Sequence, residues 1–279
     1  MSENAPSENI APPIWSPAMH YNHHASPNGT RGTALRKRAS GPLYQLKKYH
    51  NSIKRHLIET YAHHASNYLD IGCGRGGDIR KICDANVARM TGIDISPLEI
   101  AEAQRRVRET KGCVTSFEFL CGDALTWTPW QPTYYDVVAC MFCIHYFFES
   151  KEAATSIIQK ASSFLKPHGI FMGCVPDAEA LVQFARDNVK SPFLTLTPHW
   201  TEGKVFGNPY VFEMRDTVTA KTASSDGSVE YLVHFDALVS LAKEHGLHLV
   251  ESQMFDPPHS MDGAEVSRLF RWFAFKKLE

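Results

Sequence analysis

The sequence predicts an α/β domain built on a doubly wound, mainly parallel β-sheet with helices on both faces. From Leu43 onward, short apolar segments alternate with amphipathic ones, which is the pattern of successive crossover units. A glycine-rich segment, 72–77, follows the first apolar segment. Aspartates also stand at or after the ends of the first three apolar segments. Ligands of open α/β sheets bind at that edge, so these three observations predict both the fold class and the location of a site.

A helix over 43–65 opens the domain, because its apolar residues recur at helical spacing. Strands then alternate with helices, and the helix at 151–166 is expected to stop at Pro167 and Gly169. The expected strands of this half are 67–74, 88–96, 116–124, 134–142 and 169–176. The expected helices are 43–65, 77–86, 97–112 and 151–166.

The second half adds a helix at 180–188, a β-rich excursion over 204–218 and a helix at 236–246. Two closing strands, 247–255 and 267–277, end the chain. The β-rich excursion interrupts the regular alternation of strands and helices.

Charge and hydropathy exclude several classes of protein. The 279 residues carry 29 Lys and Arg against 30 Asp and Glu, a balance that excludes a wholly basic nucleic-acid coat. No apolar run approaches the roughly 20 residues that span a bilayer, so we expect a soluble, intracellular protein. Residues 1–48 hold six Lys and Arg against two Glu in a Pro-, Ser-, Asn- and Gly-rich stretch. This predicts a flexible basic arm over 1–42, which either contacts phosphates or acts as a solubilising tail, before a domain over 43–279.

The seven cysteines are scattered among apolar neighbours, which predicts reduced, buried thiols rather than a disulfide framework. Cys140 and Cys143 form a C-x-x-C pair. A zinc site needs a second pair of ligands, and the sequence has none at comparable spacing. We therefore expect thiols packed in or after a strand, and no metal site.

The segment Asp70–Asp78 carries the first chemical motif. Its glycines permit a tight turn and a close approach of the backbone to a ligand, and Asp94 ends the next strand, where a carboxylate accepts both hydroxyls of a ribose. Gly-x-Gly with a later acid is also the dinucleotide fingerprint. However, Asp70 would repel a pyrophosphate and attract an ammonium group, and Asp123 suits an adenine amino group. The three aspartates favour S-adenosylmethionine, with a turn cap as the alternative role of Asp123.

Together with more particular motifs, these residues resemble the eukaryotic-type mRNA cap guanine-N7 methyltransferases from about Tyr49 to Lys277. The motifs LDIGCGRGGD and GIDIS are general to methyltransferases. The motifs HNSIK, EYLVHF and the HYFFES block within FCIHYFFES are much more particular to the family. The further landmarks are LKPHGIFMGCVPD, VFGNPYVF and RWFAFKK. The resemblance implies a Rossmann-like, seven-stranded class I methyltransferase fold with a β-rich cap-binding insertion. It also implies methyl transfer from S-adenosylmethionine to N7 of a GpppN cap, leaving S-adenosylhomocysteine.

The resemblance also implies the site residues. The expected cofactor contacts are Lys54, Asp70, Gly72, Gly74, Asp94, Asp123, Met141 and Phe142. His145 and Tyr146 are expected to wall the guanine pocket, with Glu230 as its specificity carboxylate. The further expected cap contacts are Asn51, Arg75, Pro176, Tyr210 and Phe270.

Guanine chemistry is consistent with these roles. Guanine presents N1–H and its amino group on one edge, so Glu230 accepts from both, whereas adenine lacks this paired donor edge. His145, Tyr146 and Phe142 offer flat surfaces for a base, and stacking contributes about 1–3 kcal/mol. Guanine N7 carries a lone pair and no proton, so an in-line displacement needs no general base. Alignment and a field that favours the cationic product are sufficient, and His145, Tyr146 and Glu230 are expected to act by positioning alone. The plainer alternatives are a core aromatic for Phe142 and a solvated strand residue for Glu230.

The chain departs from the family pattern in three places. Phe270 stands where relatives carry a Tyr, so the stacking surface is kept and the hydroxyl is lost. Met141 replaces a commoner Gln near the cofactor. The segment 256–267, which joins the last two strands, is short, and part of the lid over the pocket is expected to be reduced.

Two other functions stay open beside the main one: a methyltransferase of another substrate, and an inactive cap-binding subunit. As a cap methyltransferase, the chain is expected to be a monomer that binds capped RNA 5′ ends and no membrane. The candidate protein partners are the capping guanylyltransferase, the triphosphatase and RNA polymerase. The expected location is the nucleus, or the cytoplasm for a viral enzyme, and Arg36–Arg38 is a short candidate nuclear signal.

Overall fold

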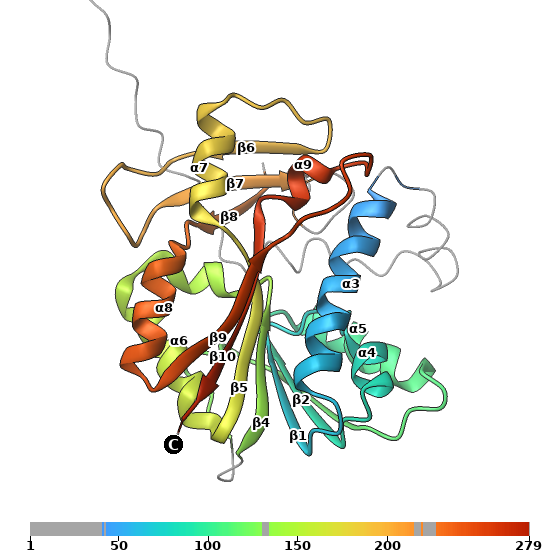
Figure 1. Ribbon diagram of the computed structural model, residues 1–279. Coiled ribbons are helices and arrows are strands. Elements are labelled where there is room, and N and C mark those ends of the chain that lie inside the picture. The colour runs from blue at the N-terminus through green and yellow to red at the C-terminus, as the bar shows by residue number, and fades with distance from the viewer. Residues whose placement is uncertain (1–40, 42, 130–133, 215–218, 220–226, 279) are drawn as a thin grey trace, which may run out of the picture.

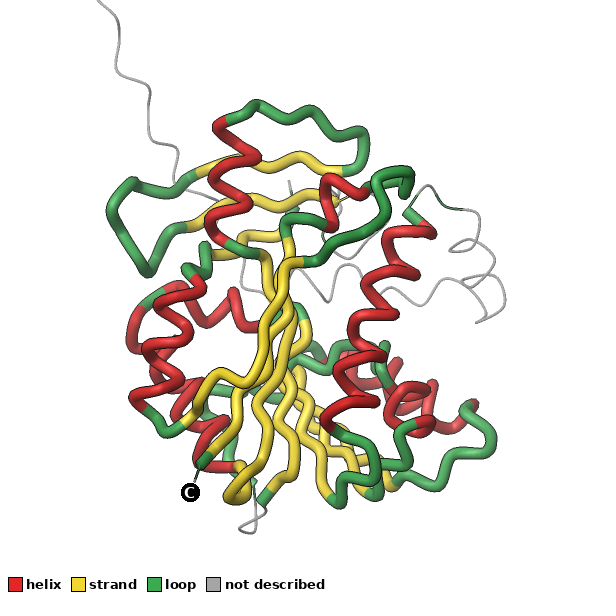
Figure 2. The backbone as a smooth tube through the Cα atoms, in the orientation of Figure 1, coloured by secondary structure: helices red, strands yellow, loops and turns green. Residues whose placement is uncertain are grey.

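The computed structural model describes residues 41, 43–129, 134–214, 219 and 227–278. A seven-stranded sheet with the order β3-β2-β1-β4-β5-β10-β9 forms its centre (Figures 1 and 2). Its first five strands pair in parallel, whereas β10 is antiparallel to both β5 and β9. The strands are β1 (Asn67–Ile71), β2 (Arg89–Asp94), β3 (Ser116–Cys121), β4 (Tyr135–Met141), β5 (Leu165–Pro176), β9 (Leu247–Met254) and β10 (Phe270–Lys277).

Helices cover both faces of this sheet, as expected for a doubly wound fold (Figure 1). The face with α3, α4 and α5 buries Leu57 and Ile82 against Tyr68 of β1. The opposite face, with α6 and α8, buries Ile157 against Leu69 of the same strand. Successive residues of β1 therefore enter different cores, because side chains alternate across a strand. The helices are α3 (Tyr44–Tyr61), α4 (Ile79–Asp84), α5 (Pro97–Glu109), α6 (Lys151–Phe164) and α8 (Phe235–Glu244).

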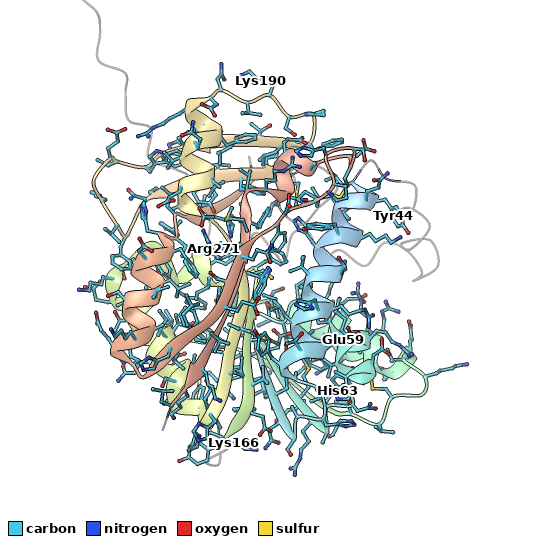
Figure 3. The ribbon with its side chains drawn as sticks, in the orientation of Figure 1. Tyr44, Glu59, His63, Lys166, Lys190 and Arg271 are labelled. Carbon is cyan, nitrogen blue, oxygen red and sulfur yellow. A yellow bond between two sulfur atoms is a disulfide. The ribbon has the colours of Figure 1, made fainter. Side chains whose placement is uncertain are left out.

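A second, three-stranded antiparallel sheet lies over the end of the main sheet at which the parallel strands finish (Figure 1). It consists of β6 (Leu194–Pro198), β7 (Pro209–Met214) and β8 (Ser228–Tyr231), with α7 (Ala178–Arg186) leading into it. Arg271 of β10, labelled in Figure 3, connects the main sheet to the start of α7, because its Nε donates at 2.8 Å to Oδ2 of Asp177, the N-cap of that helix. The predicted fold class, a mainly parallel seven-stranded sheet with a β-rich insertion, is confirmed.

Several element boundaries differ from the sequence prediction. Helix α6 ends at Phe164 and β5 already starts at Leu165, so Pro167 lies inside a strand instead of stopping a helix. Pro167 is tolerated near the start of the strand, where the register with β4 is irregular. The 3₁₀ helix η1 (Ile144–Glu149) and the short α9 (Ala264–Ser267) were not predicted. The last strand accordingly starts at Phe270, three residues later than predicted.

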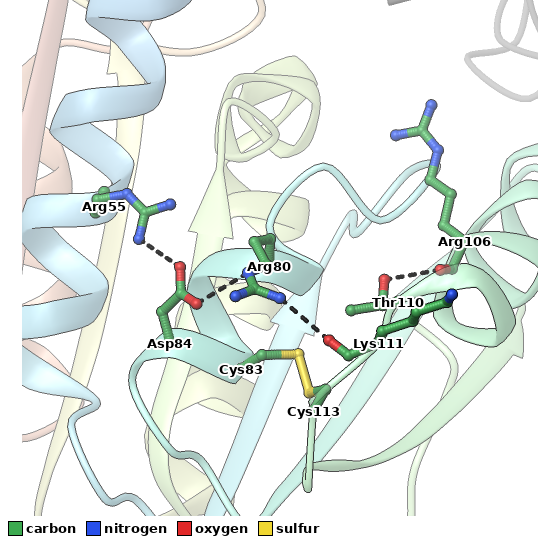
Figure 4. The surroundings of a disulfide bond; sticks show 8 residues. All are labelled: Arg55, Arg80, Cys83, Asp84, Arg106, Thr110, Lys111 and Cys113. Atoms are coloured by element: carbon green, nitrogen blue, oxygen red, sulfur yellow. Dashed lines mark hydrogen bonds and ion pairs between the residues drawn. A yellow bond between two sulfur atoms is a disulfide. The ribbon is translucent and has the colours of Figure 1, made fainter. Parts of the chain in front are cut away.

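The expectation of reduced cysteines is wrong for one pair. Cys83 at the end of α4 and Cys113 before β3 form a disulfide, with Cα atoms 5.2 Å apart (Figure 4). The other five cysteines are free thiols, and Cys140 of the C-x-x-C pair is buried in β4. Cys83 and Cys113 are 30 positions apart in the sequence, so only the folding of α4 beside the loop before β3 brings them together.

The predicted basic arm lies outside the described residues, apart from Gly41. The division between an arm and a domain at residue 42 therefore stays a prediction. Within the described ranges, no helix is long and apolar enough to cross a membrane.

Candidate functional site

The loop after β1 is held in one conformation by its glycines and by β2. Gly72 and Gly74 have φ values of +73° and +51°, in the left-handed region that glycine occupies at low cost. A side chain at Gly72 would overlap the sulfur of Cys143. The Gly72 N–H donates to Ile93 O at 2.8 Å. The loop therefore presents its backbone at the carboxyl ends of β1 and β2.

Asp94 fixes the far side of this loop. Its Oδ2 accepts from the Gly74 N–H at 2.8 Å and its Oδ1 accepts from the Ser96 N–H at 2.9 Å. Burial raises the pKa of Asp94, and these two hydrogen bonds oppose the rise. Each carboxylate oxygen keeps a further lone pair, so Asp94 remains able to accept from a hydroxyl of a ligand.

Asp123 stands two residues beyond the end of β3. Its Oδ1 accepts from the Leu125 N–H at 2.9 Å, which is the turn cap considered as the alternative role. The second oxygen remains for the predicted contact with an adenine amino group, and that contact stays a prediction.

Charged groups gather beneath the glycine loop. Lys54 of α3 donates to Asp78 Oδ2 at 2.8 Å. Burial opposes ionisation of Asp78, but Lys54 and Lys81 outweigh it and lower the pKa of Asp78 to about 2. Asp70 is buried in β1, and its Oδ1 has no hydrogen-bond partner among the described residues. Burial and the nearby Asp78 raise the pKa of Asp70 well above its usual range.

Met141 and Phe142 follow at the end of β4. Met141 is buried, with its Sδ 3.9 Å from Cys174 Sγ. Phe142 has φ of +59°, and its ring stacks on His50 with centroids 5.5 Å apart. Phe270 meets the same two rings edge-on, at 5.0 Å from His50 and 5.4 Å from Phe142. Phe270 is therefore part of an aromatic cluster between α3 and the sheet.

A second polar site is built on β7 and β8. Tyr210 and Glu230 are register partners on these strands, and the Tyr210 hydroxyl donates to Glu230 Oε2 at 2.9 Å. Glu230 is only 4% exposed. Burial raises its pKa to about 8, against the opposing hydrogen bonds from Tyr210 and Tyr146. Glu230 is therefore mostly protonated at pH 7.

His145 and Tyr146 of η1 form the adjacent wall. The Nε2 of His145 lies 3.7 Å from Glu230 Oε1, and neither ring nitrogen of His145 has a hydrogen-bond partner in the described part of the chain. Burial lowers the pKa of His145 to about 3, so the ring is neutral. The Tyr146 ring lies 4.3 Å from His145, centroid to centroid, and its hydroxyl is 2.9 Å from Ser228 Oγ.

The remaining expected cap contacts lie on other elements of the described chain. The Arg75 guanidinium forms a bidentate ion pair with the carboxylate of Glu99, in the first turn of α5. Asn51 accepts from Lys81 Nζ at 2.7 Å, next to the glycine loop. Pro176 ends β5 opposite Phe270 of β10. Among the expected cap contacts, Tyr210, His145 and Tyr146 lie directly beside Glu230.

Sequence reasoning did not select Asp78 or Lys81 as site residues, although Asp78 closes the quoted glycine motif. Lys81 follows it by three residues, and in a helix this spacing brings the two side chains together. Lys81 Nζ donates to Asp78 Oδ1 at 2.7 Å. An acidic and a basic residue three positions apart, directly after the glycine loop, could therefore have identified this ion pair from the sequence.

Comparisons with known proteins show which family the chain resembles. The model of the mRNA (guanine-N(7))-methyltransferase domain matches residues 16–269. The mRNA cap guanine-N(7) methyltransferase of Candida glabrata is 31% identical over 244 residues, 79% of this chain and 57% of that protein. The enzyme of the same name from Schizosaccharomyces pombe is 31% identical over 251 residues, 83% of this chain and 66% of that protein. The chain thus spans less than two thirds of the length of these relatives.

A solved structure has a similar fold. The N-methyltransferase NodS from Bradyrhizobium japonicum, in complex with S-adenosylhomocysteine, is 14% identical and superposes with a TM-score of 0.53. The similarity covers 89% of this chain and 98% of the NodS chain. It supports the class I methyltransferase fold.

Proposed function

Because the chain belongs to the mRNA (guanine-N7)-methyltransferase family, we propose that it transfers a methyl group from S-adenosylmethionine to N7 of the guanine in GpppN-capped RNA. The observation that carries this proposal is the buried Glu230, which faces the neutral His145 and takes a hydrogen bond from Tyr210. A buried carboxyl group without a cationic partner suits a ligand that brings its own donors. Guanine brings two on one edge.

The groups around the glycine loop fit S-adenosylmethionine. Its amino-acid end carries one ammonium and one carboxylate. Asp70 Oδ1, which has no hydrogen-bond partner among the described residues, offers an acceptor to the ammonium, and the positive charge of Lys54 complements the carboxylate. Asp94 Oδ1 and Oδ2 retain lone pairs for ribose hydroxyls, as described above. When bound, the cofactor supplies a methyl group on a positively charged sulfur. The protein's residues hold that methyl in line with the guanine.

Glu230 selects and stabilises the guanine in this proposal. As a carboxylate it accepts from both N1–H and the amino group, and it leaves adenine with an unmatched edge. N7 has no proton to remove, so no side chain acts as a base. As the guanine ring becomes cationic, the negative charge of Glu230 stabilises it. The neutral His145 adds a flat surface without adding a repelling positive charge.

The substrate in vivo is then the 5′ end of an RNA that a guanylyltransferase has already capped. The basic arm supplies charge for the triphosphate and the following nucleotides. The candidate partners are the capping guanylyltransferase, the triphosphatase and RNA polymerase, with the chain itself acting as a monomer. This assigns the protein to the nucleus, or to the cytoplasm if it is viral.

Transfer of labelled methyl from S-adenosylmethionine to GpppG-RNA tests the function, with ApppG-RNA as the control and the methylated atom mapped. We expect label at N7 of the cap guanine alone. Label on another acceptor would favour a methyltransferase of another substrate. Cofactor binding without any transfer would favour an inactive cap-binding subunit.

A further inference from the structure

Two lysines share the single carboxylate of Asp78, and they are bonded differently. Lys81 of α4 is 6% exposed, and all three of its donors are engaged. Its Nζ donates to Asp78 Oδ1 at 2.7 Å, to Asn51 Oδ1 at 2.7 Å and to Gly77 O at 3.1 Å. This one ammonium therefore joins α3, the glycine loop and the start of α4.

Lys54 makes one hydrogen bond within the described residues, to Asp78 Oδ2 at 2.8 Å. An ammonium group has three donors, so two remain for a ligand. The Nζ lies against the glycine loop, because a Cβ added at Gly77 would stand 3.8 Å from it. Of the two lysines, Lys54 is therefore the one that can donate further hydrogen bonds to a ligand at the glycine loop.

The charges of the cluster explain why two lysines are present. Asp78 carries one negative charge, which Lys54 alone would neutralise. With Lys81 also bound to Asp78, Lys54, Lys81 and Asp78 together carry a surplus of one positive charge. Burial and the neighbouring Asp78 disfavour a second negative charge on Asp70, because they raise the pKa of Asp70 well above its usual range. A surplus positive charge in a largely buried site attracts an anion strongly, because screening by water is weak there.

We infer that Lys81 is a positioning residue for the amino-acid end of S-adenosylmethionine: it neutralises Asp78 and fixes its direction, so that Lys54 is left to bind the carboxylate of the cofactor. The inference rests on the proposed function, since it concerns the same cofactor. Lys81 itself has no donor left for the cofactor and acts through Asp78 and Lys54.

The affinities for two ligands distinguish this positioning role of Lys81 from a general contribution to the stability of the fold. S-adenosylhomocysteine has the amino-acid end, whereas 5′-methylthioadenosine keeps the adenosine and lacks that end. Calorimetry on the full chain is expected to show that Lys81→Met weakens S-adenosylhomocysteine about tenfold to a hundredfold, while leaving 5′-methylthioadenosine unchanged. Lys81→Arg, which keeps the charge, should recover most of the loss. Lys243→Met, at an exposed lysine in the last turn of α8, is the matched control.

A second variant tests the charge without altering Lys81, in case Lys81→Met does not fold. Asn51 is exposed on α3 and accepts a hydrogen bond from Lys81 Nζ. Asn51→Asp therefore places a negative charge next to Lys81 and cancels the surplus positive charge of the cluster. It should weaken S-adenosylhomocysteine selectively, about threefold or more, whereas Asn51→Gln should not.

The outcomes separate this inference from the proposed function. If Lys81→Met or Asn51→Asp changes the affinities for both ligands equally, or changes neither, Lys81 is merely structural and the inference is overturned. If the unmodified chain fails to bind S-adenosylhomocysteine, the proposed function is overturned, and this inference with it.

Discussion

The two polar sites of this protein handle buried charge in opposite ways. Beneath the glycine loop, Asp78 is ionised and held between two lysines, with a pKa of about 2. In the β7–β8 site, Glu230 has no lysine or arginine partner among the described residues, and its pKa is about 8. Both carboxyl groups are almost fully buried. The difference therefore lies in their partners and not in their exposure.

This contrast suggests a division of labour between the sites. The ion pairs at the glycine loop exist before any ligand arrives, so that site is preorganised and binding there needs little rearrangement of charge. The β7–β8 site keeps a protonated carboxyl group and an imidazole whose nitrogens have no hydrogen-bond partner in the described part of the chain, and we propose that the ligand completes it. Such a site rejects a base that cannot satisfy its polar atoms.

The largest effect on methyl transfer is expected from a substitution in the β7–β8 site. Glu230→Ala removes both the guanine acceptor and the charge that stabilises the product, so methyl transfer to GpppG-RNA should fall about a thousandfold. Binding of S-adenosylhomocysteine should be unchanged, because the variant leaves the glycine loop intact. Glu179→Ala, at an exposed glutamate of α7, is the matched control. Retained transfer by Glu230→Ala would remove Glu230 from the proposed mechanism.

A smaller effect is expected at the preorganised site. Asp94→Ala deprives the N–H groups of Gly74 and Ser96 of their acceptor and removes the ribose contact. Calorimetry should show S-adenosylhomocysteine binding weakened about tenfold to a hundredfold, with binding of GpppG largely retained. Unchanged cofactor affinity would contradict the ribose role of Asp94.

The pH dependence of cap binding sharpens the contrast further. Guanine needs the ionised carboxylate, and the free site holds a proton below a pKa of about 8, so binding must release that proton. GpppG affinity should therefore rise with pH, by about tenfold per unit below pH 7, and level off above 8. His145, with a pKa of about 3, stays neutral throughout this range.

The corresponding control is Glu230→Gln, which has no proton to release. Its GpppG affinity should be weaker and nearly independent of pH. Calorimetry in two buffers of different ionisation enthalpy should count about one released proton for the unmodified chain at pH 7. A flat pH profile for the unmodified chain would mean that Glu230 is already ionised in the free protein.

Much of the fold was predictable because it depends on local pattern. The alternation of apolar and amphipathic segments indicated the parallel sheet, and the glycine loop with Asp94 indicated its functional edge. The boundaries that were missed have tertiary causes. Pro167 lies within β5 because Leu165 and Ile170, on either side of it, pair with β4. The 3₁₀ helix η1 packs against β8 through contacts that no periodicity in 144–149 reveals.

The pairings within the candidate site could not be predicted from the sequence. Glu230 and His145 were selected by the family motifs, yet the Tyr210–Glu230 hydrogen bond depends on the register of β7 and β8. Arg75 looked like a cap contact, and its pairing with Glu99 requires α5 to pack beside the glycine loop. The two lysines on Asp78 come from different helices.

The disulfide should have the smallest effect on either site, although it affects stability. It links α4 to the loop before β3, which Arg80 also holds by donating to Lys111 O at 3.2 Å (Figure 4). Cys113→Ser should lower the free energy of unfolding by about 3 kcal/mol, because the pair closes a loop of about 30 residues in the unfolded chain. Denaturant unfolding measures this, with Cys121→Ser, at an exposed free thiol, as the control.

Both ligand affinities should survive this change. Neither Asp78 nor Glu230 contacts the disulfide, and the hydrogen bond from Arg80 keeps the loop before β3 near α4. Reducing compartments such as the nucleus keep most thiols reduced, so an enzyme working there has to function without the bond. A loss of S-adenosylhomocysteine binding in Cys113→Ser would show that the preorganised site depends on the disulfide as well as on its ion pairs. Equal stability of Cys113→Ser and the unmodified chain would show that the bond does not form in solution.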